Sequence, residues 1–129
     1  MDQPAAEVPG AVRGAIRNWL RIEGLAALIF AAVLFARLEY SWALFAILFL
    51  APDVSFAGYL AGPRAGAAAY NLLHSYAGPL LLGIVLLLTG YSVAVPLIWV
   101  AHVGFDRALG YGLKYPAGFS DTHLGRIGR

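Results

Sequence analysis

Four apolar stretches dominate the chain, and each is close to the length that a helix needs to cross a membrane. They cover approximately residues 22–38, 41–61, 65–89 and 91–109. A membrane-spanning helix needs about 20 mainly apolar residues, within a range of about 17–25. The connections are only a few residues long, so each helix should run antiparallel to the one before it. The pattern predicts an all-α fold, an integral membrane up-down-up-down four-helix bundle.

The composition favours a membrane protein over a soluble one. Hydrophobic residues make up 60% of the 129 residues and charged residues only 12%. A soluble domain averages about 45–50% apolar and about 25% charged residues. A short chain has a large surface for its volume, so a soluble domain of this length could not bury so much apolar side chain. The partner expected from composition is therefore the lipid bilayer.

The nine basic residues give a formal net charge of +2 but do not indicate nucleic-acid binding. They are spread along an apolar chain and form no dense stripe that could follow a phosphate backbone. The absence of cysteine removes disulfides, thiolate metal ligands and thiol nucleophiles from consideration. No nucleic-acid partner is expected.

Basic residues are divided unevenly between the two ends of the predicted bundle. Four spans put both termini on one side, and only Arg37 lies on the other. Cytoplasmic loops of membrane proteins carry an excess of Lys and Arg. Both termini are therefore predicted to be cytoplasmic in a multi-pass protein of the cell inner (cytoplasmic) membrane. The eight residues on the predicted cytoplasmic side are Arg13, Arg17, Arg21, Arg64, Arg107, Lys114, Arg126 and Arg129.

The segments outside the spans read as tails. Residues 1–21 should form a cytoplasmic N-terminal tail that enters an interfacial helix, because prolines and charges precede a basic run beside Trp19. This polar start lacks the pattern of a secretory signal, and no cleavage is expected. Residues 22–109 form the predicted bundle of four transmembrane helices. Residues 110–129 are rich in glycine and should be a C-terminal tail over the cytoplasmic end of the bundle.

Polar side chains gather in the cytoplasmic half of every predicted span. Each ionisable group costs about 2.5–3.5 kcal/mol at the centre of such a helix, so its presence needs an explanation. A helix rises about 1.5 Å per residue, so counting residues from the connections gives the depth of each side chain in the membrane, and these depths overlap. Residues three or four positions apart in one span also share a helix face. The residues are Glu23 on the first span, Asp53 on the second, Asn71 and His74 on the third, and His102 and Asp106 on the fourth.

Carboxylates and imidazoles that converge from several helices are how helix bundles build metal sites. Imidazole with carboxylate and no thiolate suits a divalent transition metal such as Zn, Fe or Mn, and disfavours Cu(I). The Glu-x-x-His motif of di-iron bundles is absent, since an Asn occupies the Glu position. The predicted metal ligands are Asp53, His74, His102, Asp106 and Glu23, and the predicted cavity wall is Asn71, Asp121 and His123.

Proline and glycine positions add two local expectations. Pro52 removes one backbone donor and should kink the second span near residues 48–52, beside Asp53. Gly58, Gly62 and Gly66 lie at intervals of four residues around the second connection and should allow close packing there.

Several strings of residues carry a family resemblance. They include Leu50-Ala51-Pro52-Asp53, Tyr70-Asn71-x-x-His74 and His102-x-Gly104-Phe105-Asp106-Arg107, followed by the glycine-rich start of the tail. Over about residues 20–126 the chain resembles a family of small bacterial membrane proteins known only as a domain of unknown function. The resemblance implies four spans and brings no assigned activity.

Three functions remain open from the sequence, and whether the protein is an enzyme is one of the open questions. A metal at the cytoplasmic end could hydrolyse a lipid-soluble substrate. The same groups could relay protons or metal ions, but a carrier needs a polar path through the outer half, where Thr89 and Ser92 are the available side chains. A non-catalytic structural subunit is the third reading.

Overall fold

The computed structural model describes residues 7–127, which fold into helices followed by a short irregular tail. In chain order the helices are α1 (Gly14–Arg37), α2 (Trp42–Leu48), the 3-10 helix η1 (Ala51–Ala61), α3 (Pro63–Leu73), α4 (Ala77–Thr89) and α5 (Ala94–Leu109). The strands β1 (Asp121–Thr122) and β2 (Gly125–Arg126) pair antiparallel in the tail. The prediction of an all-α fold is confirmed.

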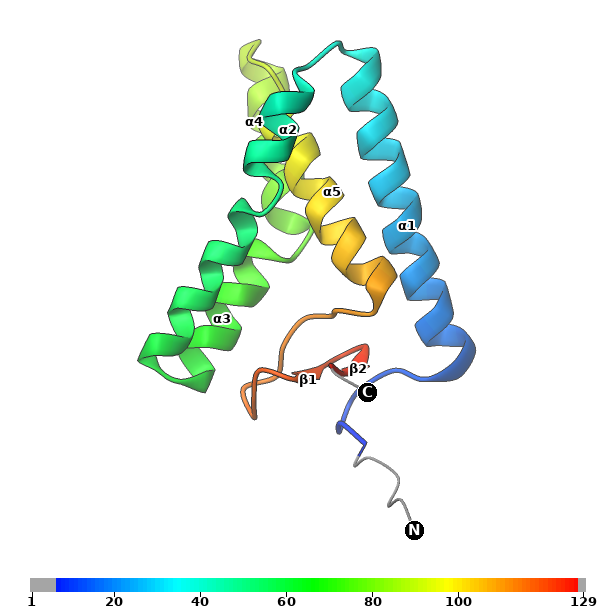
Figure 1. Ribbon diagram of the computed structural model, residues 1–129, viewed down its shortest axis with the longest axis vertical. Coiled ribbons are helices and arrows are strands. Elements are labelled where there is room, and N and C mark those ends of the chain that lie inside the picture. The colour runs from blue at the N-terminus through cyan, green and yellow to red at the C-terminus, as the bar shows by residue number, and fades with distance from the viewer. Residues whose placement is uncertain (1–6, 128–129) are drawn as a thin grey trace.

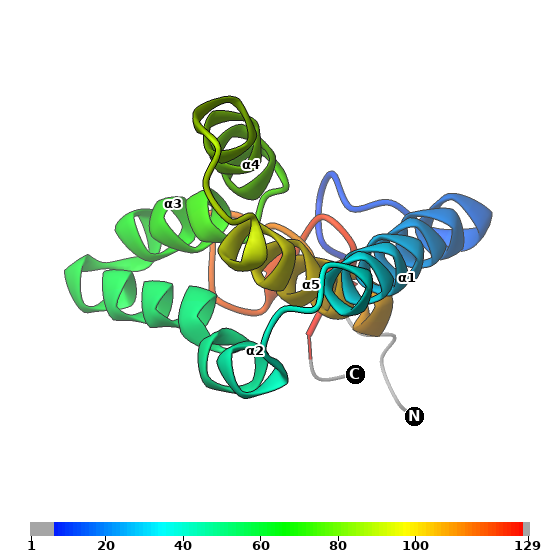
Figure 2. The same cartoon turned by 90° about the horizontal axis from the view of Figure 1, so that it is seen from above.

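Helix α5 lies at the centre of the structure. It packs along α1 and also contacts α4 and α2, while η1 and α3 pack against each other. In Figures 1 and 2, α1 lies on one side of α5, and η1 and α3 lie on the other. Nine of the 16 residues of α5 are buried, against three of 24 in α1. The apolar core forms where α1 meets α5, from Ala31, Phe35, Ala94, Leu97, Ile98 and Ala101.

Three helical segments of the described chain are long and apolar enough to cross a membrane. They are Gly14–Arg37, Trp42–Ala61 and Pro63–Thr89. Their outer surfaces are apolar: Leu60 is 93% exposed and Leu88 is 83% exposed. Water would disfavour such surfaces and lipid would not, so the chain is a membrane protein. The fourth predicted span folds as α5, which at 16 residues is shorter than these three, and the four-span topology stays a prediction.

Two of the predicted spans are interrupted by a change in helix geometry. The second breaks between Leu48, where α2 ends, and Ala51, where η1 begins, which confirms the kink expected from Pro52. The third, predicted over 65–89 with an irregularity at Pro79, breaks between Leu73 and Ala77. Pro79, in the first turn of α4, has no N–H and would clash with the carbonyl four residues earlier. Both breaks lie close to candidate metal ligands.

The tail lies across the end of the helices that also holds the start of α1 (Figure 1). Backbone and side-chain hydrogen bonds tie it to the N-terminal segment. The Val12 N–H donates to the His123 carbonyl at 2.9 Å, and the Tyr115 hydroxyl donates to the Gly10 carbonyl at 3.0 Å. Residues from both ends of the chain therefore form one cover at this end of the structure.

Candidate metal centre

Four side chains from η1, α5 and the end of α3 converge on one point. Asp53, His74, His102 and Asp106 each offer a ligand atom, and these atoms all lie within 4.8 Å of one another. Nε2 of His74 lies 3.0 Å from Asp53 Oδ1 and 3.4 Å from Asp106 Oδ2. Nε2 of His102 lies 3.2 Å and 3.3 Å from the same two oxygens. The two Nε2 atoms are 3.0 Å apart.

These distances have the size expected for the edges of a small coordination tetrahedron. A tetrahedral ion with Zn–N and Zn–O distances of about 2.0–2.1 Å holds its ligand atoms about 3.3–3.4 Å apart. Five of the six separations between the four donor atoms range from 3.0 to 3.4 Å, and the sixth, between the two carboxylate oxygens, is at most 4.8 Å. The two nitrogens and two oxygens can therefore surround a single ion with little movement.

The proton positions also favour a cation between these groups. Nδ1 of His74 lies 2.9 Å from the Tyr70 carbonyl. A carbonyl only accepts, so Nδ1 carries the proton, and Nε2 of the neutral ring presents a lone pair to the cluster. That lone pair faces the carboxylate of Asp53 and the second imidazole. Two acceptors at this distance repel unless a shared proton or a metal ion lies between them.

His74 is held at the break between α3 and α4 by groups of α5. Trp99 Nε1 donates to the Leu73 carbonyl at 2.7 Å, and the Arg107 guanidinium donates to the His74 carbonyl at 2.9 Å. These two bonds satisfy carbonyls that the interrupted helix leaves free. The Tyr70 ring stacks on the imidazole, with centroids 3.7 Å apart and an interplanar angle of 6°. The His74 ring is therefore fixed from both its backbone and its face.

His102 lies close to the other helix break, the one between α2 and η1. Because Pro52 has no N–H and the Asp53 N–H donates to Leu50, the Phe49 carbonyl has lost its usual helix partners. The backbone of Phe49 lies close to the His102 imidazole. Nδ1 is buried and, among the described residues, completes no hydrogen bond of good geometry. A backbone carbonyl in this position is what commonly orients a metal-binding histidine.

The site is closed on one side and open on the other. The histidine side chains are 1% exposed, whereas those of Asp53 and Asp106 are 31% and 14% exposed. Both carboxylates line a pocket of about 280 Å³, whose lining also includes Lys114 and Phe119 of the tail. The imidazoles therefore face the protein interior, and the carboxylates face the space that a small molecule could enter.

The chain belongs to the family described as "Domain of unknown function (DUF4260)". The match covers residues 17–127, which includes the four converging residues and the tail. The expectation of an uncharacterised family is thereby confirmed. No curated protein and no solved structure matches the chain.

The other predicted site residues lie outside the group of four converging side chains. Glu23 is exposed on α1 and is outside the group of four. The Asn71 side chain instead pairs with the backbone of Lys114, accepting its N–H at 2.6 Å and donating to its carbonyl at 2.8 Å. His123 Nδ1 accepts the Leu113 N–H at 2.8 Å, and Asp121 lies 3.8 Å from Arg126. Asn71 and His123 thus hold the tail in place.

Lys114 is a buried cation that the sequence analysis counted only among the basic residues of the predicted cytoplasmic side. It is 3% exposed, and its Nζ donates to the Phe119 carbonyl at 2.6 Å. The ammonium lies 3.7 Å from the ring centroid of Phe119 and 4.5 Å from that of Tyr70. Burial lowers the pKa of Lys114 to about 8, although the charges of Asp106 and Asp53 act in the opposite direction. The lysine is therefore mostly protonated at neutral pH.

Proposed function

We propose that the protein is an integral membrane metalloprotein that holds one divalent transition metal between Asp53, His74, His102 and Asp106 and hydrolyses a lipid-soluble substrate. The donor–donor distances carry the proposal, because five of the six are close to the edge lengths of a tetrahedral site. Among Zn, Fe and Mn, the tetrahedral arrangement of two imidazoles and two carboxylates favours Zn²⁺, since Mn²⁺ prefers octahedral oxygen sites.

The arrangement of the pocket supports hydrolysis as the chemistry. When bound, a divalent ion at this point lowers the pKa of water and polarises a carbonyl or phosphoryl oxygen. A catalytic ion needs one position free for water or substrate. Asp53 is the more exposed of the two carboxylates, so it would be the ligand that leaves the ion, makes room for a water molecule from the pocket and accepts its proton. Tyr70 and Arg107 hold His74 in position.

A second, apolar pocket supports a lipid-soluble substrate. It has a volume of about 200 Å³ and lies against both helix breaks, lined by Leu48, Ala51, Pro52, Leu73, Val95, Ile98 and Trp99. The residues next in the chain to Pro52 and Leu73 are Asp53 and His74. An acyl or prenyl chain in this pocket would bring an attached polar group close to the metal centre.

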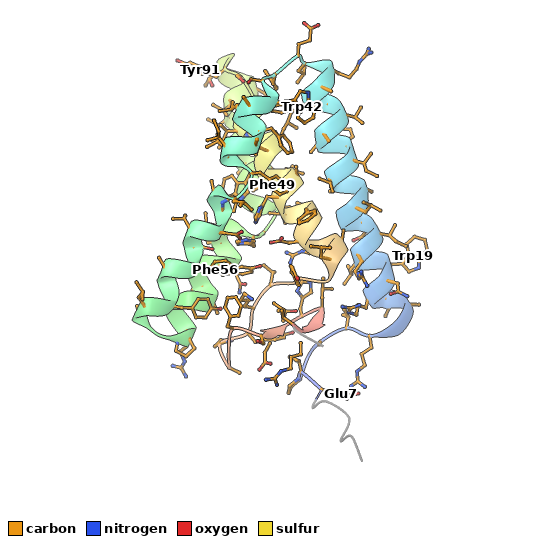
Figure 3. All side chains as sticks on the ribbon, viewed as in Figure 1. Glu7, Trp19, Trp42, Phe49, Phe56 and Tyr91 are labelled. Carbon is orange, nitrogen blue, oxygen red and sulfur yellow. The ribbon has the colours of Figure 1, made fainter. Side chains whose placement is uncertain are left out.

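The orientation in the membrane is also part of the proposal. Four spans with both termini in the cytoplasm would put the metal centre near the cytoplasmic surface of the inner membrane. Exposed Trp42 and Tyr91 lie near one end of the structure and exposed Trp19 nearer the other (Figure 3). Such aromatic rings prefer the two membrane–water interfaces.

Reporter fusions test this orientation. Because eight of the nine basic residues fall on one predicted side, a reporter fused after residue 129 is expected to be cytoplasmic. A reporter inserted within residues 38–40 is expected on the opposite side. A C-terminal reporter outside the cytoplasm, or both reporters on one side, would contradict the topology.

Elemental analysis tests the metal. Protein purified in mild detergent without chelators is expected to hold close to one equivalent of Zn per chain. His74→Ala and His102→Ala should each lose nearly all of it, because a missing imidazole opens the tetrahedron, and Asp53→Asn should bind at least tenfold more weakly. Glu23→Gln is the matched control, since Glu23 lies outside the group. A wild type that neither carries metal nor binds added Zn²⁺ would contradict the proposal.

The carrier alternative gains little support from the other end of the structure. Thr89 donates to the Val85 carbonyl within its own helix, and the Tyr40 hydroxyl accepts the Val93 N–H. These side chains are used in local hydrogen bonds and do not suggest a continuous polar path. A structural subunit, the third alternative, predicts no metal and is tested by the same elemental analysis.

A further inference from the structure

Without a metal ion, the charged side chains next to the candidate metal centre have a net charge of about zero. Asp53 and Asp106 contribute two negative charges. Arg107, which is 8% exposed, and Lys114, which is 3% exposed, contribute two positive charges. The Arg107 guanidinium donates to the His74 carbonyl and, at 3.4 Å, to the Tyr111 carbonyl, so its hydrogen bonds go to neutral groups. The nearby charges therefore sum to about zero.

A divalent ion would disturb this balance. Two carboxylates neutralise the ion, which leaves the charges of Arg107 and Lys114 without a counterion in a buried setting. Uncompensated buried charge is strongly unfavourable, whereas a paired and hydrogen-bonded charge is tolerated. The metal-loaded site should therefore take up an anion, and the surplus of two positive charges fits a dianion best.

The pocket offers a place for that anion. The two carboxylates and Lys114 line the same cavity of about 280 Å³, together with the aromatic side chains Phe56, Tyr70, Tyr111 and Phe119 and with Ile127. Of the three N–H bonds of the Lys114 ammonium, one donates to Phe119. The others are available to an oxygen in the pocket. The ammonium also occupies the aromatic surface of Phe119 and Tyr70, so a cationic ligand would be repelled there.

We propose that this pocket binds the phosphoryl group of a phosphate ester, with one oxygen directed to the metal centre and another accepting a hydrogen bond from Lys114. A phosphate monoester carries about −1.5 to −2 charges at pH 7, whereas a carboxylate carries only one. The inference rests on the proposed metal centre and names the substrate class of that site. The same phosphoryl chemistry occurs in a lipid headgroup and in a soluble phosphate ester.

Metal and phosphate are then expected to bind cooperatively. If phosphate relieves the surplus charge created by the metal, it must tighten metal binding by the same factor by which the metal tightens phosphate binding. We expect a factor of at least ten. Removing the charge of Lys114 should remove most of this coupling, because Arg107, the cation that remains, does not line the pocket. Binding of the metal alone should be unchanged or tighter, because one repelling cation is gone.

The test measures Co²⁺ binding to the full chain in mild detergent, with buffered free metal and the visible absorption of Co²⁺ as the readout. Wild type, Lys114→Gln and Lys114→Met are each titrated alone, with inorganic phosphate and with acetate. Arg64→Gln is the control, because Arg64 is an exposed cation in α3 outside the pocket. Broadening of the ³¹P resonance of phosphate by bound Co²⁺ gives a second measurement on the wild type alone.

Two further arms identify the source of the phosphoryl group. Short-chain phosphatidic acid is compared with inorganic phosphate, and short-chain diacylglycerol controls for the acyl chains. Both phosphate compounds should tighten Co²⁺ binding at least tenfold in wild type and Arg64→Gln, and less than twofold in the Lys114 variants. A much larger effect of phosphatidic acid would assign a lipid headgroup, and equal effects would assign a soluble ester.

The opposite results are equally distinct. Three results would overturn the phosphoryl site without contradicting the metal centre. They are Co²⁺ binding by the wild type that phosphate does not tighten, tightening by phosphate that persists in both Lys114 variants, and tightening by acetate that equals the effect of phosphate. If Co²⁺ does not bind at all without anion or with it, the metal centre itself is wrong, and this inference falls with it.

Discussion

Zn²⁺ is expected to stabilise the purified protein by about 4 kcal/mol when its free concentration is 1,000 times the dissociation constant. Only the folded chain brings together ligands from η1, α5 and the end of α3, so the binding free energy adds to the free energy of unfolding. Thermal unfolding in mild detergent, followed by circular dichroism with Zn²⁺ and with a chelator, measures the effect.

Two variants make this measurement specific to the site. His102→Ala should lose the response to Zn²⁺, because it removes one corner of the tetrahedron, whereas Glu23→Gln should respond as the wild type does. An ordinary interhelical hydrogen bond in a membrane contributes only about 0.6 kcal/mol on average. If Zn²⁺ has no effect on the wild type and His102→Ala changes its stability by less than about 1 kcal/mol, the cluster is structural only.

The sequence was sufficient to predict that the polar side chains gather toward one end of the helices. Counting residues from the connections placed Asp53, His74 and His102 at overlapping depths, and helix periodicity put Asp106 on the face of His102. The structure brings these four residues together. Glu23 was predicted as a metal ligand only from its depth in the membrane. At that depth, however, the buried residue of α1 is its neighbour Gly24. Successive residues point about 100° apart around a helix, so burial of one exposes the other.

The details that shape the site depend on tertiary contacts that periodicity does not encode. Pro52 and Pro79 predicted irregular helix geometry. The position of the break at His74 also depends on Trp99 and Arg107 reaching the freed carbonyls. Lys114 counted in the sequence only toward the basic side of the membrane. Its burial follows from the pairing of its backbone with Asn71, which joins segments 43 residues apart.

Gly104→Ala is expected to destabilise the protein, although alanine normally favours a helix over glycine. A Cβ atom on Gly104 would lie 2.5 Å from the Gly24 carbonyl oxygen and 2.8 Å from the Leu28 backbone nitrogen. Both are backbone atoms of α1, so no side chain can rotate away, and α1 and α5 would have to separate. Overpacking of this kind costs about 1–3 kcal/mol. Chemical or thermal unfolding of the two proteins in the same detergent measures the difference.

Gly83→Ala is the matched control in another helix. Its Cβ would lie 3.6 Å from the Pro96 Cβ, which is an ordinary contact, so the change should be neutral or stabilising by up to about 1 kcal/mol. Equal effects of the two substitutions would contradict the packing argument. Gly104 is two residues from both His102 and Asp106, about 200° around α5 from each, so it faces α1 while they face the metal centre. Displacing α5 from α1 should therefore weaken Zn²⁺ binding as well, because two of the four ligands move with that helix.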